Sequence, residues 1–90
     1  MMTRTVKGII DGDTFRVTPD WEWNGKKGNK VRPAGVVEPD KGEAGYLLAT
    51  EVLYNLLIHK TVTLEPIKMS FDRLLCGVFL DGVDIATLLK

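Results

Sequence analysis

Ninety residues are enough for one small domain, and twelve acidic residues balance twelve lysines and arginines, so the formal net charge at pH 7 is zero. This balance excludes a nucleic-acid-binding protein that depends on a strongly basic composition, while a local basic patch stays compatible with it. The single cysteine excludes a disulfide framework, and no apolar run reaches the roughly 18 residues of a membrane-spanning helix. With no secretion signal at the N-terminus, we expect one cytoplasmic domain over residues 1–90 with no membrane partner.

The chain is predicted to begin with two strands joined by a tight turn. Strand-forming residues dominate residues 4–10 and 13–18, and the Asp-Gly pair between them is a strong hairpin signal. Trp21 and Trp23 follow two residues apart, on one face of a strand, where packing is favoured over base stacking. Residues 24–29 are rich in turn formers and are expected to form a loop.

A third strand and a helix are predicted next. The strand covers residues 30–37, and Pro33 within it indicates an edge or a bulge. Asp40 and Glu43 have the spacing of a capping box at the start of a helix. Apolar residues then recur at intervals of three and four as far as Ile58, which is typical of an amphipathic helix.

The last third of the chain returns to strand patterns. Strands are expected over residues 60–65 and 74–80, and residues 83–90 are expected to pair briefly and then begin a second helix. Cys76 lies inside an apolar run, which predicts a buried thiol. Three strands, a helix and two further strands form the element order of a five-stranded OB-fold barrel, so we expect a β (α+β) domain of that class.

Short motifs follow one another in a distinctive order along this pattern. They are Asp11-Gly12-Asp13-Thr14, residues 31–40 (VRPAGVVEPD), Gly42 to Ala44, Lys60-Thr61-Val62, Phe71-Asp72-Arg73-Leu74-Leu75 and Asp81-Gly82. In this order they resemble the staphylococcal nuclease (thermonuclease) family, whose pattern reads D-G-D-T, V-R-L-x-G-I-D-x-P-E, a helix, G-K-x-V, Y-G-R-x-L and D-G. The resemblance implies an OB-fold and calcium-dependent hydrolysis of DNA and RNA phosphodiesters.

The resemblance also implies roles for individual residues. Arg32 and Arg73 match the two catalytic arginines, whose guanidinium groups suit the charge that develops on a phosphodiester under attack by water. Asp40 matches the carboxylate that orients the water, although it is one methylene shorter than the glutamate of the family. Single-stranded DNA or RNA is the expected partner.

For the metal, the resemblance implies a calcium ion with Asp13 as direct ligand and with Asp11 and Thr14 beside it in the pocket. Val37 stands where the family has a second metal-binding carboxylate, and a hard cation gains nothing from an isopropyl group. Glu38 could supply a carboxylate only through a bulge, because on a regular strand it points to the opposite face. We therefore expect a weakened calcium site and weak or absent cleavage.

Structural roles compete with each of these assignments. Asp11 and Asp13 suit an ordinary hairpin turn, and Asp40 suits a helix cap. The cluster Lys26, Lys27 and Lys30 suits a solvated loop, with phosphate contact as the functional interpretation. The functional alternatives are a metal-dependent nuclease, a nucleic-acid-binding relative that does not cut, and a protein-interaction module. The family's chain continues into further helices, so we expect a truncated C-terminus whose exposed surface could pair copies of the chain.

Overall fold

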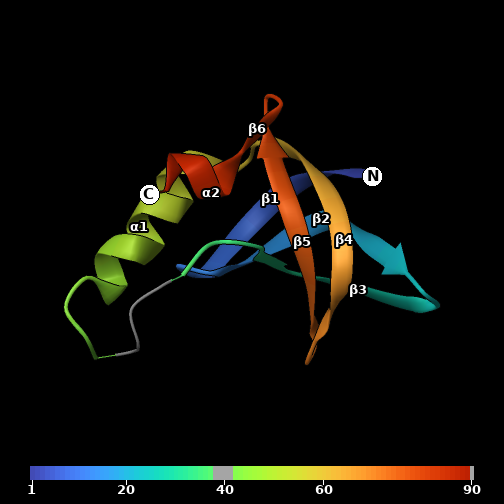
Figure 1. The fold of residues 1–90 in the computed structure, drawn as a ribbon, viewed down its shortest axis with the longest axis horizontal. Helices are drawn as coiled ribbons and strands as arrows, with labels where there is room; N and C mark the ends of the chain where they lie inside the picture. The colour runs from blue at the N-terminus through green and yellow to red at the C-terminus, as the bar shows by residue number, and fades with distance from the viewer. Residues whose placement is uncertain (38–41, 90) are drawn as a thin grey trace.

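The computed structural model describes residues 1–37 and 42–89, which form a barrel with one helix at its side and a short helix near the C-terminus (Figure 1). The elements in chain order are β1 (Met2–Asp11), β2 (Thr14–Trp23), β3 (Lys26–Pro33), α1 (Tyr46–Leu57), β4 (Thr61–Ser70), β5 (Arg73–Leu80), β6 (Val83–Asp84) and α2 (Ile85–Leu88). The predicted order of strands and helix is therefore confirmed, including the brief strand and helix at the C-terminus.

The barrel closes through one parallel pair of strands. Antiparallel pairing joins β3 to β2, β2 to β1, β1 to β4 and β4 to β5. The circle is completed where β3 and β5 run side by side, with Val31 opposite Leu74 and Arg32 opposite Leu75. Within the described residues this gives a closed five-stranded mixed barrel with a helix between β3 and β4, as an OB-like fold requires.

The core follows from the alternation of side chains along these strands. Phe15 and Val17 on β2, Val31 on β3 and Leu74 on β5 are fully buried, while their neighbours face outward. Cys76 is buried among them as predicted, and burial raises the pKa of its thiol to about 12. The thiol therefore stays protonated and behaves as a small apolar side chain.

Trp21 is the largest of the fully buried side chains. Its ring lies over Gly28, directly opposite on β3, where an added Cβ would stand 2.8 Å from the ring. Its Nε1–H donates to the carbonyl oxygen of Lys30 at 3.0 Å, so the buried polar atom is satisfied. Trp23 is partly buried against the same core, so packing is confirmed as the role of both tryptophans.

The start of α1 differs from the prediction. The helix begins at Tyr46 with Gly45 as its N-cap and without a side-chain cap, so Asp40 and Glu43 do not form a capping box at its N-terminus. Gly42 and Gly45 have φ angles of +96° and +91°, values that place turns rather than helix before Tyr46. Asp40 itself lies outside the described residues.

Several strand boundaries also differ: β2 continues to Trp23 and β4 to Ser70, beyond the predicted ends at residues 18 and 65. Asn24 and Gly25 alone form the turn between β2 and β3, with φ angles of 50° and 76°, so Lys26 and Lys27 belong to a strand and not to a loop. The third strand ends at Pro33, and Gly35 with φ +79° turns the chain away from the barrel. Among the described residues, no helix has both the length and the apolar character needed to cross a membrane.

Candidate functional site

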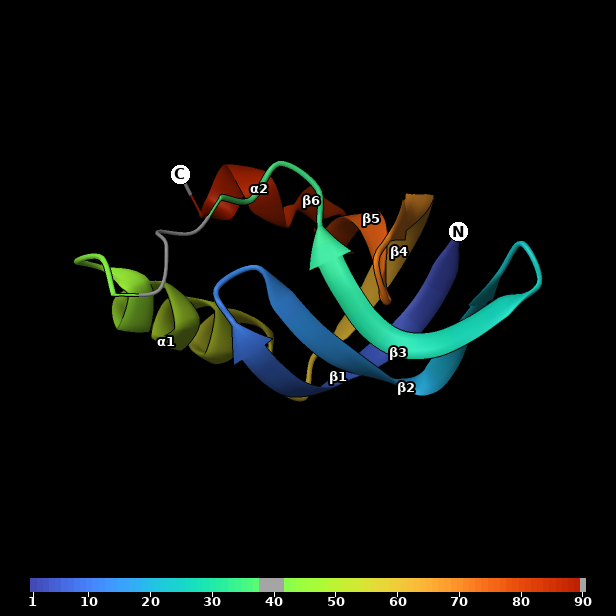
Figure 2. The ribbon, with the colours of Figure 1, turned by 90° about the horizontal axis from the view of Figure 1, so that it is seen from below.

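The predicted motifs meet on the outer wall of the barrel, where β2, β3 and β5 lie side by side (Figure 2). Phe15 pairs with Val31 and both side chains point into the core, so the residues before and after them face outward. The accessible residues of this region are Arg16 on β2, Lys30 and Arg32 on β3, and Arg73 on β5, and Thr14 of β2 lies beside them as a buried polar residue, 3% exposed. Residues that are distant in sequence thus form one face.

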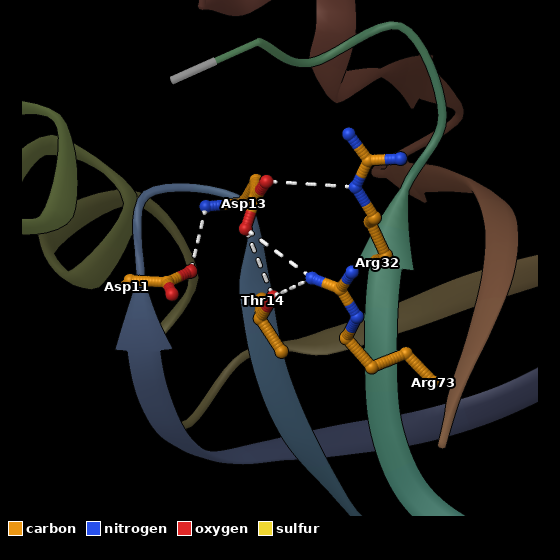
Figure 3. Close-up of polar contacts among 5 residues, drawn as sticks. All are labelled: Asp11, Asp13, Thr14, Arg32 and Arg73. Carbon is orange, nitrogen blue, oxygen red and sulfur yellow. Dashed lines mark hydrogen bonds and ion pairs between the residues drawn. The ribbon is translucent and has the colours of Figure 1, made fainter. Parts of the chain in front are cut away.

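Asp13 is the centre of this site (Figure 3). Its Oδ2 atom accepts a hydrogen bond from Arg32 Nε at 3.5 Å, and its Oδ1 atom lies 3.7 Å from Arg73 Nη1. Arg73 Nη1 also donates to Thr14 Oγ1 at 3.0 Å, and this hydroxyl donates to Asp13 Oδ1 at 2.9 Å. Two guanidinium groups from different strands therefore converge on one carboxylate.

The tight turn holds Asp13 in this position. Gly12 and Asp13 form the turn between the paired residues Asp11 and Thr14. The backbone N–H of Asp13 donates to Asp11 Oδ1 at 3.2 Å, which is a local side-chain bond of the kind that stabilises turns. Asp11 and Asp13 therefore belong to an ordinary hairpin turn, and this turn aims the Asp13 carboxylate at two arginines.

The pKa values of the two carboxylates at the turn, Asp11 and Asp13, are shifted in opposite directions. Burial raises the pKa of Asp11, and the neighbouring Asp13 raises it further. Burial also acts to raise the pKa of Asp13, but hydrogen bonds from Asp11 and Thr14 and the charges of Arg32 and Arg73 outweigh it and hold this pKa below its usual range. Asp13 therefore keeps its negative charge to a lower pH than Asp11 does.

Asp13→Asn is expected to lower the free energy of unfolding at pH 7 by about 1–2 kcal/mol, because the charge that faces the two arginines is lost. Since the pKa of Asp13 is lowered in the folded state, its contribution to stability is complete above the unfolded-state value of about 4 and is lost as the pH falls through the folded-state value. The difference from the wild type, measured by urea denaturation, should therefore shrink as the pH falls below about 4.

Asp72 offers the matched control. Its carboxylate accepts a hydrogen bond from Lys30 Nζ at 2.7 Å, which lowers its pKa, but it is largely exposed to solvent. Asp72→Asn should leave the urea midpoint unchanged at pH 7. An Asp13→Asn variant as stable as the wild type at pH 7, or a difference that grows toward low pH, would contradict the role given to the Asp13 ion pairs.

The structure brings some of the predicted site residues together and separates others. Asp11, Asp13, Thr14, Arg32 and Arg73 are in contact through the bonds described above. Lys30 lies on the same strand and face as Arg32 and pairs with Asp72. Glu38 and Asp40, the other predicted carboxylates, lie outside the described residues.

Lys26 and Lys27 are placed away from this site. They stand at the opposite end of β3, beside Trp23 and Glu22 of the neighbouring strand. Lys26 is six positions from Arg32, which corresponds to about 20 Å along an extended strand. A contact of these two lysines with nucleic acid stays a prediction, and such a contact would be remote from Asp13.

Calcium does not fit the described residues of this site by themselves. Both carboxylate oxygens of Asp13 are already engaged by arginine or threonine groups, and Arg32 and Arg73 supply positive charge where a cation would sit. Among residues 1–37 and 42–89, no group of three or more His, Cys, Asp or Glu side chains is placed to hold a metal ion. The calcium prediction thus stays a prediction that would need carboxylates from the segment 38–41.

Val37 is part of a different feature. Its side chain is 89% exposed and lines an apolar pocket of about 470 Å³, together with Leu48 and Val52 of α1 and Leu89 near the C-terminus. Leu47, on the same helix, is also exposed. Pairing between copies of the chain would need an exposed apolar surface of this kind. That pairing stays a prediction.

Sequence reasoning missed two members of the outer face. Arg16 is exposed on β2 opposite Lys30, and the alternation of buried and outward residues along β2 could have placed it there. Sequence reasoning assigned Phe71 no role beyond its place in the motif of residues 71–75, although its position in a two-residue turn between two strands signals exposure. A comparison with protein-family models finds no match for this chain, and a comparison with curated proteins finds none either.

Proposed function

We propose that this domain binds single-stranded nucleic acid through a backbone phosphate at Arg32 and Arg73, in a thermonuclease-like site whose hydrolytic activity is weak or lost. The observation that carries the proposal is the convergence of the two guanidinium groups on Asp13, at 3.5 and 3.7 Å, from neighbouring strands of the barrel. OB-folds commonly bind oligonucleotides on this face and on the loops beside it.

The chemistry of the two arginines supports a phosphate ligand. A guanidinium group offers five N–H donors in a planar fork, and the bonds to Asp13 and Thr14 use only part of this capacity in Arg32 and Arg73. Both arginine side chains are partly exposed, at 35% and 24%, so further donors are open to a ligand. Two forks held at a fixed separation suit the tetrahedral oxygens of a phosphodiester.

The charges around the site support the same class of ligand. The cations Arg16, Lys30, Arg32 and Arg73 share this face with the carboxylates of Asp13 and Asp72. The chain as a whole carries no net charge, so this local excess of positive charge is what would attract a polyanion. Binding that depends on so few contacts should be moderate in affinity and sensitive to salt.

Weak hydrolysis follows from the state of Asp13. A carboxylate that two arginines neutralise is a poor ligand for a cation and a poor base for water. Arg32 and Arg73 could still stabilise negative charge on a phosphodiester, but among the described residues no group of three or more His, Cys, Asp or Glu side chains is placed to hold a metal ion that would activate water beside them. The arrangement favours holding a phosphodiester over cleaving it.

The test is the binding of a fluorescent single-stranded oligonucleotide, followed by anisotropy with calcium and with a chelator over a range of salt concentrations. We expect log K to fall with log salt at a slope of about −1.5 to −3, because two to four phosphates are contacted at roughly −0.7 each. Calcium should not change the affinity of the domain for the oligonucleotide, and the oligonucleotide should keep its full length because it is not cleaved. Absence of binding at low salt, or binding that ignores salt, would refute the proposal.

Cleavage that requires calcium would instead establish a working nuclease. The metal ligands would then have to be sought among residues 38–41, because the described carboxylates do not suffice. The same oligonucleotide, analysed on a denaturing gel after incubation, gives this answer directly.

A further inference from the structure

Phe71 is the most exposed of the large apolar side chains outside the segment 38–41, at 94%. It is the first residue of the two-residue turn between β4 and β5, and Asp72 is the second. Exposing an aromatic ring of this size to water gains nothing for the stability of the folded chain. Its presence therefore needs an explanation other than packing.

The backbone conformation at Phe71 also disfavours an aromatic residue there. Its φ angle is +58°, a left-handed value that a bulky side chain rarely adopts. In the described part of the chain, the hairpin turns at residues 24–25 and 81–82 meet the same need with Asn-Gly and Asp-Gly. A glycine or asparagine at position 71 would satisfy the turn, so the aromatic residue is held at a site that does not favour it. Such outliers occur often at functional sites.

The tip that carries Phe71 is fixed beside the phosphate-binding arginines. Asp72 accepts a hydrogen bond from Lys30 on β3 at 2.7 Å, which ties the turn to the outer face. Arg73 follows immediately and reaches Thr14 and Asp13. The Cα atoms of Phe71 and Arg73 are at most about 7 Å apart, because only Asp72 lies between them. An exposed aromatic side chain thus lies close in the chain to the cationic Arg73.

We infer that Phe71 stacks on an unpaired base of the nucleic acid whose phosphate is bound by Arg73 and Arg32. This inference rests on the proposed function and names its substrate class: single strands with accessible bases, and not duplexes. Bases inside a duplex are already stacked on each other and cannot present a face to a side chain. Stacking on a phenyl ring tolerates every base, so the preference is for single strands without a strict sequence.

The test compares two probes of about ten nucleotides, within the site size of an OB-fold: oligothymidine and an abasic sugar–phosphate chain of equal length and charge. The wild type should bind oligothymidine about 5- to 100-fold more tightly than the abasic chain. Phe71→Ala should remove this preference and leave the affinity for the abasic chain unchanged, while Phe71→Trp should keep it. Leu47→Ala, which removes an exposed apolar side chain from α1, is the matched control and should change neither affinity.

The thermal stability of a second variant distinguishes a loss of stacking from a loss of folding. Phe71→Gly should also remove the preference for bases, yet raise the midpoint of thermal unfolding by about 2–6 °C, because glycine accepts the positive φ angle. A variant that is more stable and binds less well cannot owe its defect to misfolding.

The outcomes distinguish the two proposals. If the wild type binds neither probe, the proposed function itself fails. If it binds both probes with equal affinity, phosphate binding stands and stacking by Phe71 is refuted. If the preference for oligothymidine survives in Phe71→Ala, the bases are read elsewhere and the inference is likewise overturned.

Discussion

Replacing Trp21 with alanine is expected to lower the free energy of unfolding by about 3–5 kcal/mol, as measured by urea denaturation followed by circular dichroism. The indole is 1% exposed and fills the space over Gly28, and alanine would leave a cavity there. The carbonyl oxygen of Lys30 would also lose its hydrogen bond from Nε1. A domain of this size has a total stability of about 5–13 kcal/mol, so the variant should be marginal at room temperature.

Trp23→Ala is the matched control for this result. Trp23 lies two residues further along β2, is only partly buried and stands at the edge of the core, so its loss should cost far less, about 1 kcal/mol. Similar effects of the two substitutions would contradict the central role of Trp21. Trp21→Phe should give an intermediate loss, because it keeps part of the ring volume and gives up the Nε1–H donor.

The double variant Arg32→Ala/Arg73→Ala is expected to lower the affinity for single-stranded oligonucleotide by about 100-fold or more. A hydrogen bond to a charged group contributes about 1.5–3 kcal/mol, and the proposal assigns such bonds to both arginines. Anisotropy titration at low salt measures the loss, and the slope of log K against log salt should become shallower by about 0.7, because the one phosphate contact that the two arginines share is removed. Replacing both residues with lysine should restore only part of the affinity, because lysine keeps the charge and lacks the planar fork.

Lys26→Ala/Lys27→Ala is the control with the same change in net charge. These lysines stand at the far end of β3 from Arg32, so their removal should reduce affinity only slightly. If the two double variants weaken binding equally, the ligand responds to overall charge and the arginine pair has no special role. If neither weakens it, the ligand binds another surface.

The barrel could be predicted because its signals are local. Alternation of apolar and polar residues identifies each strand, as in Phe15, Arg16 and Val17, and the Asp-Gly pairs at 11–12 and 81–82 separate the strands. The order of these elements then leaves few ways to close a sheet. The burial of Cys76 followed in the same way from its apolar neighbours.

The start of α1 could not be predicted because two local signals compete there. Asp40 and Glu43 have the right spacing for a capping box, but Gly42 and Gly45 favour turns between them and the apolar stripe. In the structure the glycines determine the boundary, and the helix begins at Tyr46. The spacing of Asp40 and Glu43 alone does not show which of the two competing local patterns the chain adopts.

The electrostatics of the site depend on contacts that no local pattern contains. The resemblance gave Asp13 and the two arginines separate roles, as metal ligand and as phosphate-binding groups. Their mutual ion pairs require that β2, β3 and β5 lie side by side, and this depends on the parallel register of Val31 with Leu74. Sequence reasoning therefore grouped Asp13, Arg32 and Arg73, which the structure brings into contact, and missed the ion pairs that they form with one another.

The parallel pairing of β3 with β5 would also couple the proposed binding to the folding of the chain. Arg32 and Arg73 are 41 positions apart in the chain, and they meet only across this seam. Contacts of such long range are among the slowest to form, so a partly folded chain with an open seam has no assembled pair of arginines. A ligand that bridges the two residues binds the closed barrel alone and draws the population of chains toward it by mass action. A ligand that contacts both arginines would therefore stabilise the pairing of β3 with β5, and with it the folded barrel.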